Sequence, residues 1–324
     1  MKRQLALIFG LMFMFGLSQE KRDFQWWNPA EQDIPVIEGQ AWPKEVEQFY
    51  DRLPARARHS VSSDVWGLSK ESAGLMIRFR SNSREIKVKY QLRNIQNYAL
   101  NHMPATGVSG LDLYAITSDG EELWYAGQRR FGDSTVTYTF ANVRPNDKYH
   151  KLGREYRLFL PLYNQVMDLE IGTKPDTYFE VLPVRKDKPI VVYGTSIAQG
   201  ACASRPGMAW TALLGRKMDR PLVNLGFSGS GRLDTAVIDL LTEIDAKIYI
   251  LDCMPNLTQN VWGSLGIEDD LAFKERILNA VGLLRAEKPD TPILLAEHAG
   301  FSDEDIHPDK QKMAQNVNAI QRQA

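Results

Sequence analysis

The chain has 324 residues, enough for two domains that each bury a core of their own. Hydrophobic residues make up 44% of the sequence, which is typical of a globular protein. The formal net charge is −1, which excludes a protein that binds nucleic acid or anionic membranes through a large positive charge. With only two cysteines, no disulfide framework is expected. Cys202 and Cys253 are predicted to be reduced, partly buried thiols, although an exported protein could join them.

The N-terminus has the pattern of an export signal. A basic start is followed by an apolar run from residue 5 to residue 17, which is too short to span a bilayer comfortably. Gly16 and Ser18 are small residues at the spacing that a signal peptidase requires. We therefore expect residues 1–18 to be a signal peptide cleaved near Ser18, and the protein to be periplasmic or secreted. The alternative is an uncleaved N-terminal anchor.

Residues 24–183 are predicted to form a β-sandwich domain. Residues 85–93 alternate polar and apolar side chains with period two, as in a strand that buries one face. Further strands are expected over residues 75–80, 111–116, 122–125, 136–140, 155–160 and 166–171. Many short strands separated by turns favour an antiparallel sandwich.

The pattern changes after the charged stretch 185–189. From there, apolar runs alternate with helical stretches. The runs cover residues 190–193, 222–225, 248–251 and 293–296, and the helices about 209–218, 234–243 and 270–286. Buried apolar strands that alternate with helices predict a parallel sheet. We expect a flavodoxin-like, three-layer α/β domain over residues 188–324.

Three residues that suit acyl transfer follow the first three predicted strands of this domain. Ligands of an open parallel sheet bind beyond the carboxyl ends of its strands. Ser196 follows the first strand in a glycine-containing turn, and a helix beginning there would direct N–H groups at an oxyanion. Gly229 lies in a Gly/Ser-rich turn, where no Cβ blocks its N–H, and Asn256 offers a side-chain amide. Ser196 is the predicted nucleophile, and all three residues are predicted to form the oxyanion hole.

Each of these residues also has a simpler explanation. Ser196 is the type of residue that caps a helix, Gly229 could serve only its turn, and Asn256 could bond its own loop. Their shared position at the sheet edge favours the chemical role. Asp112 is expected to cap or pin a loop of the sandwich without taking part in chemistry. Arg205 is expected to be solvated, with a contact to substrate as the alternative.

Four sequence blocks resemble those of a known family. Residues 194–196, Gly-Thr-Ser, residues 228–229 and residues 254–256, Met-Pro-Asn, are similar to successive blocks of the SGNH (GDSL-like) hydrolases. Residues 110–114 spell the Gly-x-Asp-Leu-Tyr signature of a subgroup with an N-terminal β-sandwich, so the resemblance extends from about residue 25 to residue 324.

The resemblance implies a serine esterase that removes O-acetyl or other small acyl groups, with no metal or organic cofactor. The expected partner is a small acyl ester or an acylated glycan. Neither nucleic acid nor stable membrane insertion after signal removal is expected. The alternatives are a non-catalytic glycan-binding protein, and a lipase or thioesterase of the same fold, which would need a wide apolar cleft.

A serine nucleophile needs a general base. The resemblance implies an Asp-x-x-His block after a fifth strand, and this block is not found. His298 follows the fourth strand, one strand too early, whereas His307 precedes a proline but has Glu304 three residues before it. We expect the block to lie beyond Ala324. The alternatives are His307 as base, oriented by Glu304 or Asp305, and a natural variant without catalysis.

Overall fold

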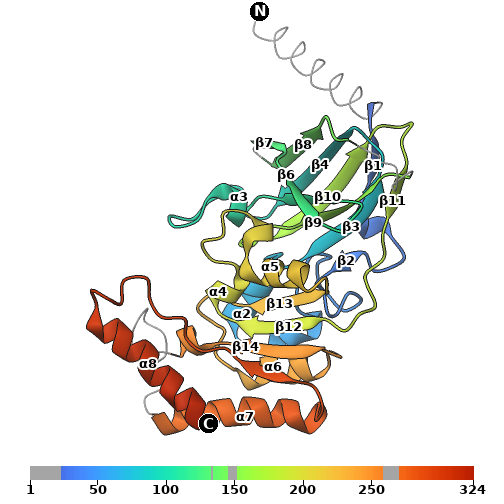
Figure 1. Cartoon of the computed structure of the whole chain (residues 1–324). Helices are drawn as coiled ribbons and strands as arrows, with labels where there is room; N and C mark the ends of the chain where they lie inside the picture. Colours follow the sequence, from blue (N-terminus) through green and yellow to red (C-terminus); the bar gives the residue numbers. More distant parts are fainter. Residues whose placement is uncertain (1–22, 133, 145–151, 258–269) are drawn as a thin grey trace, which may run out of the picture.

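The computed structural model describes residues 23–132, 134–144, 152–257 and 270–324. The predicted signal peptide lies outside these residues. The described chain forms a β-sandwich, drawn at the top of Figure 1, and an α/β domain below it. None of the helices in the described ranges has the length and apolar character needed to cross a membrane.

Two antiparallel sheets form the sandwich, as predicted. One sheet has the order β1-β10-β4-β8-β7, with strands Gln25–Trp27, Val166–Thr173, Glu85–Leu92, Thr135–Ala141 and Gln128–Phe131. The other has the order β11-β3-β9-β5-β6, with strands Phe179–Val181, Met76–Ser81, Arg154–Phe159, Asp112–Ile116 and Glu122–Tyr125, and β2 (Ile37–Glu38) also pairs with β3. The alternation predicted for β4 holds, because Ile86, Val88 and Tyr90 are buried between half-exposed neighbours.

The α/β domain contains a parallel sheet in the order β13-β12-β14-β15. These strands are Leu222–Gly226, Ile190–Gly194, Ile248–Asp252 and Ile293–Leu295. The chain passes from β12 to a neighbour on one side and then to a neighbour on the other, so the carboxyl end of β12 lies at the topological switch point. The register places Gly194 beside both Gly226 and Asp252.

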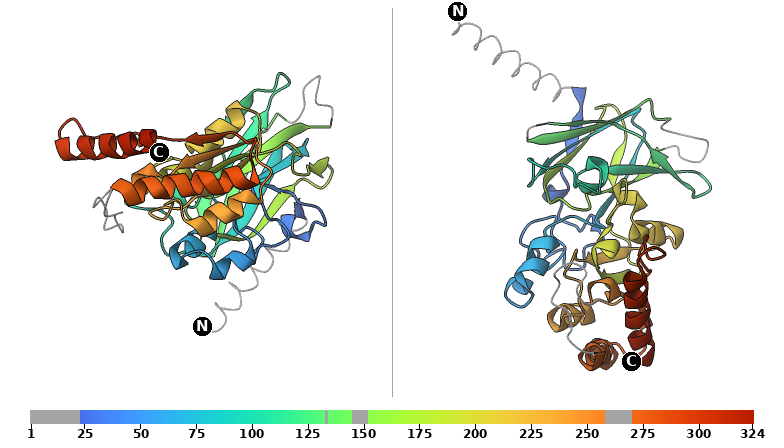
Figure 2. Two further views of the ribbon diagram at one scale, coloured as in Figure 1. Left: turned by 90° about the horizontal axis from the view of Figure 1, so that it is seen from below. Right: turned by 90° about the vertical axis from the view of Figure 1, so that its left-hand side faces the viewer.

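Helices cover both faces of this sheet, which confirms the predicted fold class. On one face, α5 packs against residues of β12 and β13 such as Val192 and Leu222. On the other face, α6 and α7 pack against Val191, Tyr193 and Leu225. The helices of this domain are α4 (Ser196–Gln199), α5 (Trp210–Lys217), α6 (Thr235–Thr242), α7 (Asp270–Glu287) and α8 (Pro308–Gln323), with 3-10 turns η3 (Pro206–Met208) and η4 (Met254–Asn256). The orange α7 crosses the molecule in the view from below in Figure 2.

An N-terminal stretch of the chain belongs to the core of the α/β domain. Trp42, Leu53 and Val65 are buried in the same cluster as α6 and α7. The blue helix α2 lies beside the parallel sheet and not with the sandwich (Figures 1 and 2). Helical segments before β5 are η1 (Pro29–Glu31), η2 (Ala55–His59), α2 (Ser63–Ser69) and α3 (Ala105–Val108). The stretch from Trp42 to Val65 therefore packs with the α/β domain, although it precedes most of the sandwich in the sequence.

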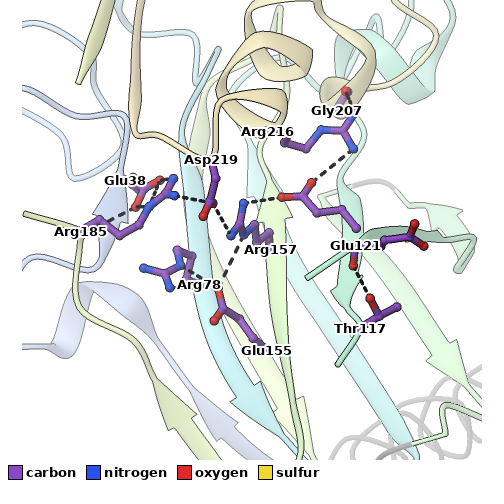
Figure 3. A network of polar contacts seen from close by, with 11 residues as sticks. Glu38, Arg78, Thr117, Glu121, Glu155, Arg157, Arg185, Gly207, Arg216 and Asp219 are labelled. Carbon is purple, nitrogen blue, oxygen red and sulfur yellow. Dashed lines mark hydrogen bonds and ion pairs between the residues drawn. The ribbon is translucent and has the colours of Figure 1, made fainter. Parts of the chain in front are cut away.

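An ion-pair network also joins the two units (Figure 3). Asp219 accepts hydrogen bonds from Arg157 of β9 at 3.0 Å and from Arg185 of the linker at 2.9 Å. Arg185 is also paired with the buried Glu38, and Arg157 with Glu122. Through Arg185, the network ties the linker that precedes β12 to Glu38 and Asp219.

Candidate active site

Ser196 stands at the carboxyl end of β12 with its hydroxyl unengaged. The preceding Thr195 caps α4, because its side-chain oxygen accepts from the Ile197 N–H at 3.2 Å. The helix-capping explanation for Ser196 is therefore wrong. Ser196 is partly exposed, and within the described residues its Oγ has no hydrogen-bond partner. A hydroxyl in this position is available to a ligand in the crevice.

Gly229 lies on an exposed turn that follows β13. Its φ is +70°, a conformation that favours glycine, but a Cβ at this position would meet no atom within 4 Å. Close packing against other backbone atoms occurs instead at the neighbouring glycines, Gly231 and Gly226. A Cβ on Gly231 would overlap the carbonyl oxygen of Gly194, and one on Gly226 would overlap the backbone N of Gln199. Within the protein, Gly229 therefore needs glycine for its backbone angle, and the close approach of a substrate to its N–H stays a prediction.

Asn256 connects the end of β14 to the same turn. With its side-chain oxygen directed at the turn, it accepts from the N–H groups of Ser230 at 3.2 Å and Gly231 at 3.1 Å. It therefore bonds a neighbouring loop and not its own, and its amide nitrogen remains as a donor. Because Gly231 also packs against Gly194, the three turns that carry Ser196, Gly229 and Asn256 are in contact.

A buried glutamine joins the nucleophile helix to the Gly229 turn. Gln199, the last residue of α4, is fully buried, and its side-chain oxygen accepts from the Ser228 N–H at 2.9 Å. Its amide nitrogen donates to the Leu162 carbonyl at 3.1 Å and to the Glu71 carboxylate. Burial raises the pKa of Glu71 to about 7, against the opposing effect of the Arg52 guanidinium.

The buried side chain of Arg52 binds the backbone at the carboxyl end of β13. Its Nη1 donates to the carbonyls of Asn224 at 3.1 Å and Gly226 at 2.8 Å, and its Nε to the carbonyl of Glu71 at 2.7 Å. The guanidinium lies 4.9 Å from the centre of the Phe227 ring. This buried cation is satisfied by backbone carbonyls, so it fixes the strand end from which the Gly229 turn departs. No local sequence pattern reveals it, because its partners are remote in the chain.

A tyrosine of the sandwich domain also contacts the backbone of Ser196. Tyr163, which follows β9, donates its phenol hydrogen to the backbone oxygen of Ser196 at 3.1 Å. Burial raises the pKa of this phenol, so it stays protonated and able to donate. Tyr163 was not singled out from the sequence.

Comparison with known proteins decides the family. Residues 24–179 match the model of the N-terminus of SGNH-hydrolase-type esterases, and residues 187–324 match that of the GDSL-like lipase/acylhydrolase family. The crystal structure of a protein named as a GDSL-like lipase from Bacteroides ovatus superposes with a TM-score of 0.79 at 30% identity, covering 93% of this chain and 82% of that one. The chain belongs to the GDSL-like lipase/acylhydrolase family. The family and fold class predicted from the sequence are confirmed.

A second structure shares the fold of this GDSL-like hydrolase. It is the salicylyl-acyltransferase of a tetracycline biosynthetic pathway, with a TM-score of 0.63 at 18% identity, covering 93% of this chain and 82% of that one. A search of curated proteins finds no match.

The signature residue Asp112 ties the two domains of the GDSL-like hydrolase together. It is buried, and its carboxylate accepts from the Gly207 N–H at 3.0 Å, from Tyr114 at 3.2 Å and from the Trp124 indole. Burial raises its pKa to about 6. The expectation that Asp112 pins a sandwich loop is therefore wrong in one respect, because the loop it holds belongs to the α/β domain.

Arg205 is engaged and not solvated. Its Nε lies 3.2 Å from the Asp112 carboxylate, its guanidinium stacks 4.1 Å from the Trp124 ring, and its side chain is 25% exposed. Both cysteines are free, as expected, but Cys202 is exposed and Cys253 is buried. Burial raises the pKa of the Cys253 thiol, which keeps it inert.

One acidic group at the sheet edge has no polar partner for its side chain within the described chain. Asp252 ends β14 and is 8% exposed. Burial alone raises its pKa to about 7. It was not predicted as a site residue.

The two C-terminal histidines each have contacts within the C-terminal segment. His298 is buried, and its Nδ1 accepts from the Gly300 N–H at 2.9 Å; burial lowers its pKa. His307 is the N-cap residue of α8, and its Nε2 lies 3.6 Å from the Asp303 carboxylate. In the described ranges neither ring is hydrogen-bonded to Ser196.

Proposed function

We propose that this GDSL-like hydrolase is a serine esterase that removes small acyl groups, such as O-acetyl, from a carbohydrate. The observation that carries the proposal is the unengaged Ser196 hydroxyl at the switch point of the sheet, in contact with the turns of Gly229 and Asn256. Family membership supports hydrolysis in general. Tyr163, whose phenol bonds the Ser196 carbonyl, also lines a groove of mostly polar residues, and this supports a hydrophilic substrate.

The proposed reaction proceeds in two steps. Ser196 Oγ attacks the ester carbonyl while a histidine accepts its proton, and the oxyanion is held by the N–H groups of Ser196 and Gly229 and by the Asn256 amide. The alcohol then leaves with the proton returned by the histidine. Water attacks the acyl-enzyme in the same way and releases the acid.

The general base is proposed to be a histidine with an acidic partner. His307, whose Nε2 lies 3.6 Å from the Asp303 carboxylate, is the candidate within this chain. The other candidate is an Asp-x-x-His block of a longer chain.

Hydrolysis of p-nitrophenyl acetate tests the proposal. We would compare residues 19–324 with Ser196→Ala and His307→Ala, and in parallel measure labelling by phenylmethylsulfonyl fluoride with mass spectrometry. Activity and labelling that vanish in Ser196→Ala are expected, with a rate loss on the order of a millionfold for a complete catalytic unit. Labelling at another residue, or equal activity of Ser196→Ala, would overturn the assignment of Ser196.

The His307 variant separates the two sources of the base. A loss of similar size in His307→Ala assigns the base to that residue. If His307→Ala retains full activity, another base acts. If the wild type is inactive but a chain extended past residue 324 is active, the base lies in the extension. Inactivity of both forms toward acetyl esters would contradict the proposed function.

We also propose that the protein is exported through the signal in residues 1–18. Fractionation of cells that produce the full chain should place the shortened protein outside the cytoplasm. Deletion of residues 2–18 should keep it inside.

A further inference from the structure

A polar groove adjoins the nucleophile turn. Its volume is about 680 Å³, within the range of small-ligand sites. It is lined by Trp66 of α2 and by Lys70, which follows this helix, by the wall segment 93–96, and by Glu71 and residues 163–165. In Figure 1 the teal segment before α3 projects on the same side of the molecule as α4.

Two residues belong to both the groove and the site. Tyr163 lines the groove and bonds the Ser196 carbonyl at 3.1 Å. Glu71 lines the groove and accepts from Gln199, which holds the Gly229 turn. A molecule that contacts Tyr163 in the groove therefore lies one side chain away from Ser196.

The walls are held in place by buried polar groups. Asn164, 3% exposed, accepts from the Asn94 N–H at 3.1 Å and donates to the Asn94 carbonyl at 2.8 Å. The Asn94 side chain in turn accepts from the N–H groups of the next residues, Gln96 and Asn97. This wall is ordered before any ligand arrives, which lowers the entropic cost of binding.

The charged groups near Trp66 are neutralised within the protein. Lys70 Nζ donates to Glu47 at 2.6 Å and to Asp51 at 2.7 Å, and Arg58 pairs with Glu47 at 3.1 Å. Lys70 also lies 4.0 Å from the centre of the Trp66 ring. These groups offer hydrogen bonds and a flat indole, but no net charge.

Arg93 differs from these charged groups because no acidic side chain in the described chain pairs with it. It is exposed at the groove, and its only side-chain contact in the described chain is a 3.3 Å hydrogen bond to the Gln165 amide oxygen. Gln165 is itself held by Asp51 at 3.0 Å, so it orients the guanidinium without neutralising it. A guanidinium that lacks an acidic partner suits a carboxylate, which it can bind through two parallel hydrogen bonds.

We propose that this groove binds the alcohol part of the ester, and that this part is a saccharide carrying a carboxylate, which pairs with Arg93. The proposal rests on the esterase function proposed above. Hydroxyl groups of a sugar match the amides and charged groups of the walls, whereas an apolar chain would meet Ile95 as its only aliphatic side chain.

Calorimetric binding to Ser196→Ala tests the groove without requiring turnover. The probes are trigalacturonate, which is acidic, and xylotriose, which is neutral. Trigalacturonate is expected to bind more tightly, with an affinity that falls as salt rises. Arg93→Ala should weaken its binding about tenfold. The control is Arg84→Ala, which removes an exposed arginine from the β3–β4 turn of the sandwich and should leave the affinity unchanged.

The outcomes separate this proposal from the esterase function. Binding of trigalacturonate that Arg93→Ala does not weaken, equal binding of xylotriose, or no binding of either probe overturns the groove proposal. Arg93-dependent binding by a protein whose wild type hydrolyses no acetyl ester supports the groove and contradicts the esterase. If the wild type is active, Arg93→Ala should also raise KM for acetylated trigalacturonate relative to Arg84→Ala.

Discussion

The side-chain oxygen of Gln199 accepts a 2.9 Å hydrogen bond from the backbone N–H of Ser228. Gln199 ends the helix that begins with Ser196, and Ser228 precedes Gly229. One buried amide thus sets the position of the nucleophile helix relative to a predicted oxyanion donor. Its other two contacts, with Leu162 and Glu71, come from residues outside the α/β sequence. The N-terminal half of the chain therefore supports the geometry of the site.

Gln199→Met should lower catalysis more than substrate binding. The variant keeps the length of the side chain but leaves the Ser228 N–H without an acceptor, so the Gly229 donor shifts. We expect kcat for p-nitrophenyl acetate to fall about 10- to 100-fold, less than for outright loss of an oxyanion donor, with little change in KM. Stability should fall by about 1–3 kcal/mol because a buried donor is left unsatisfied.

The control is Gln321→Met on α8. Gln321 is also buried, and its amide donates to the Leu295 carbonyl at 3.4 Å, away from the Gly229 turn. This variant should lose stability in urea denaturation and keep kcat. Equal kcat in both variants would show that Gln199 has only a structural role.

Asp252→Asn should stabilise the protein at alkaline pH. Burial raises the pKa of Asp252 to about 7 in the folded protein, above the value of about 4 in an unfolded chain. The folded state therefore binds the extra proton between these values, and the wild type loses stability as pH rises through this window. Asparagine carries no charge, so its advantage over the wild type should grow by about 2 kcal/mol between pH 5 and pH 8.

Urea denaturation at the two pH values measures this difference. Asp119→Asn serves as a control of opposite sign, because the Thr117 hydroxyl lowers the pKa of Asp119 and its stabilising effect is complete by about pH 5. Its difference from the wild type should be the same at pH 5 and pH 8. If the difference in unfolding free energy between Asp252→Asn and the wild type is also the same at both pH values, Asp252 has an ordinary pKa.

Asp112→Ala should destabilise the protein strongly. The change leaves Arg205 and the Gly207 N–H without their buried acceptor, and removal of one partner of a buried ion pair costs about 3–5 kcal/mol. Asp219→Ala is the matched comparison, because Asp219 also pairs with an arginine across the domain boundary but its side chain is 75% exposed (Figure 3). Its loss should cost below about 1 kcal/mol. Similar Tm values for the two variants would contradict this ranking.

The sequence predicted what depends on local pattern. Residue alternation located β4, and apolar runs located β12, β13 and β14, so the edge that carries Ser196, Gly229 and Asn256 could be placed. The capping of α4 by Thr195 was missed, because a Gly-Thr-Ser turn offers two residues that can cap.

Long-range contacts could not be predicted. Arg52 bonds carbonyls 172 and 174 residues away, and the Tyr163 contact with Ser196 spans 33 residues. Such side chains look like ordinary surface or core residues until the fold brings their partners together. The same holds for Asp112, whose signature is visible in the sequence but whose partner loop is not.

Gly229 and Gly231, which lie in the same turn, should respond differently to alanine. A Cβ on Gly231 would overlap the Gly194 carbonyl oxygen, which belongs to the turn just before Ser196. Gly231→Ala must therefore displace one of the two turns, and we expect kcat to fall at least about 100-fold, because small displacements of reacting groups have such effects. At Gly229 a Cβ meets nothing within 4 Å, and only its φ of +70° opposes alanine.

Gly229→Ala should therefore cost about 1–2 kcal/mol of stability and retain more activity than Gly231→Ala. Steady-state kinetics with p-nitrophenyl acetate, together with urea denaturation of both variants, measures the order. The reverse order, with Gly229→Ala inactive and Gly231→Ala active, would mean that bound substrate comes close to the Cβ position of residue 229. The crevice would then be narrower there than the ligand-free geometry indicates.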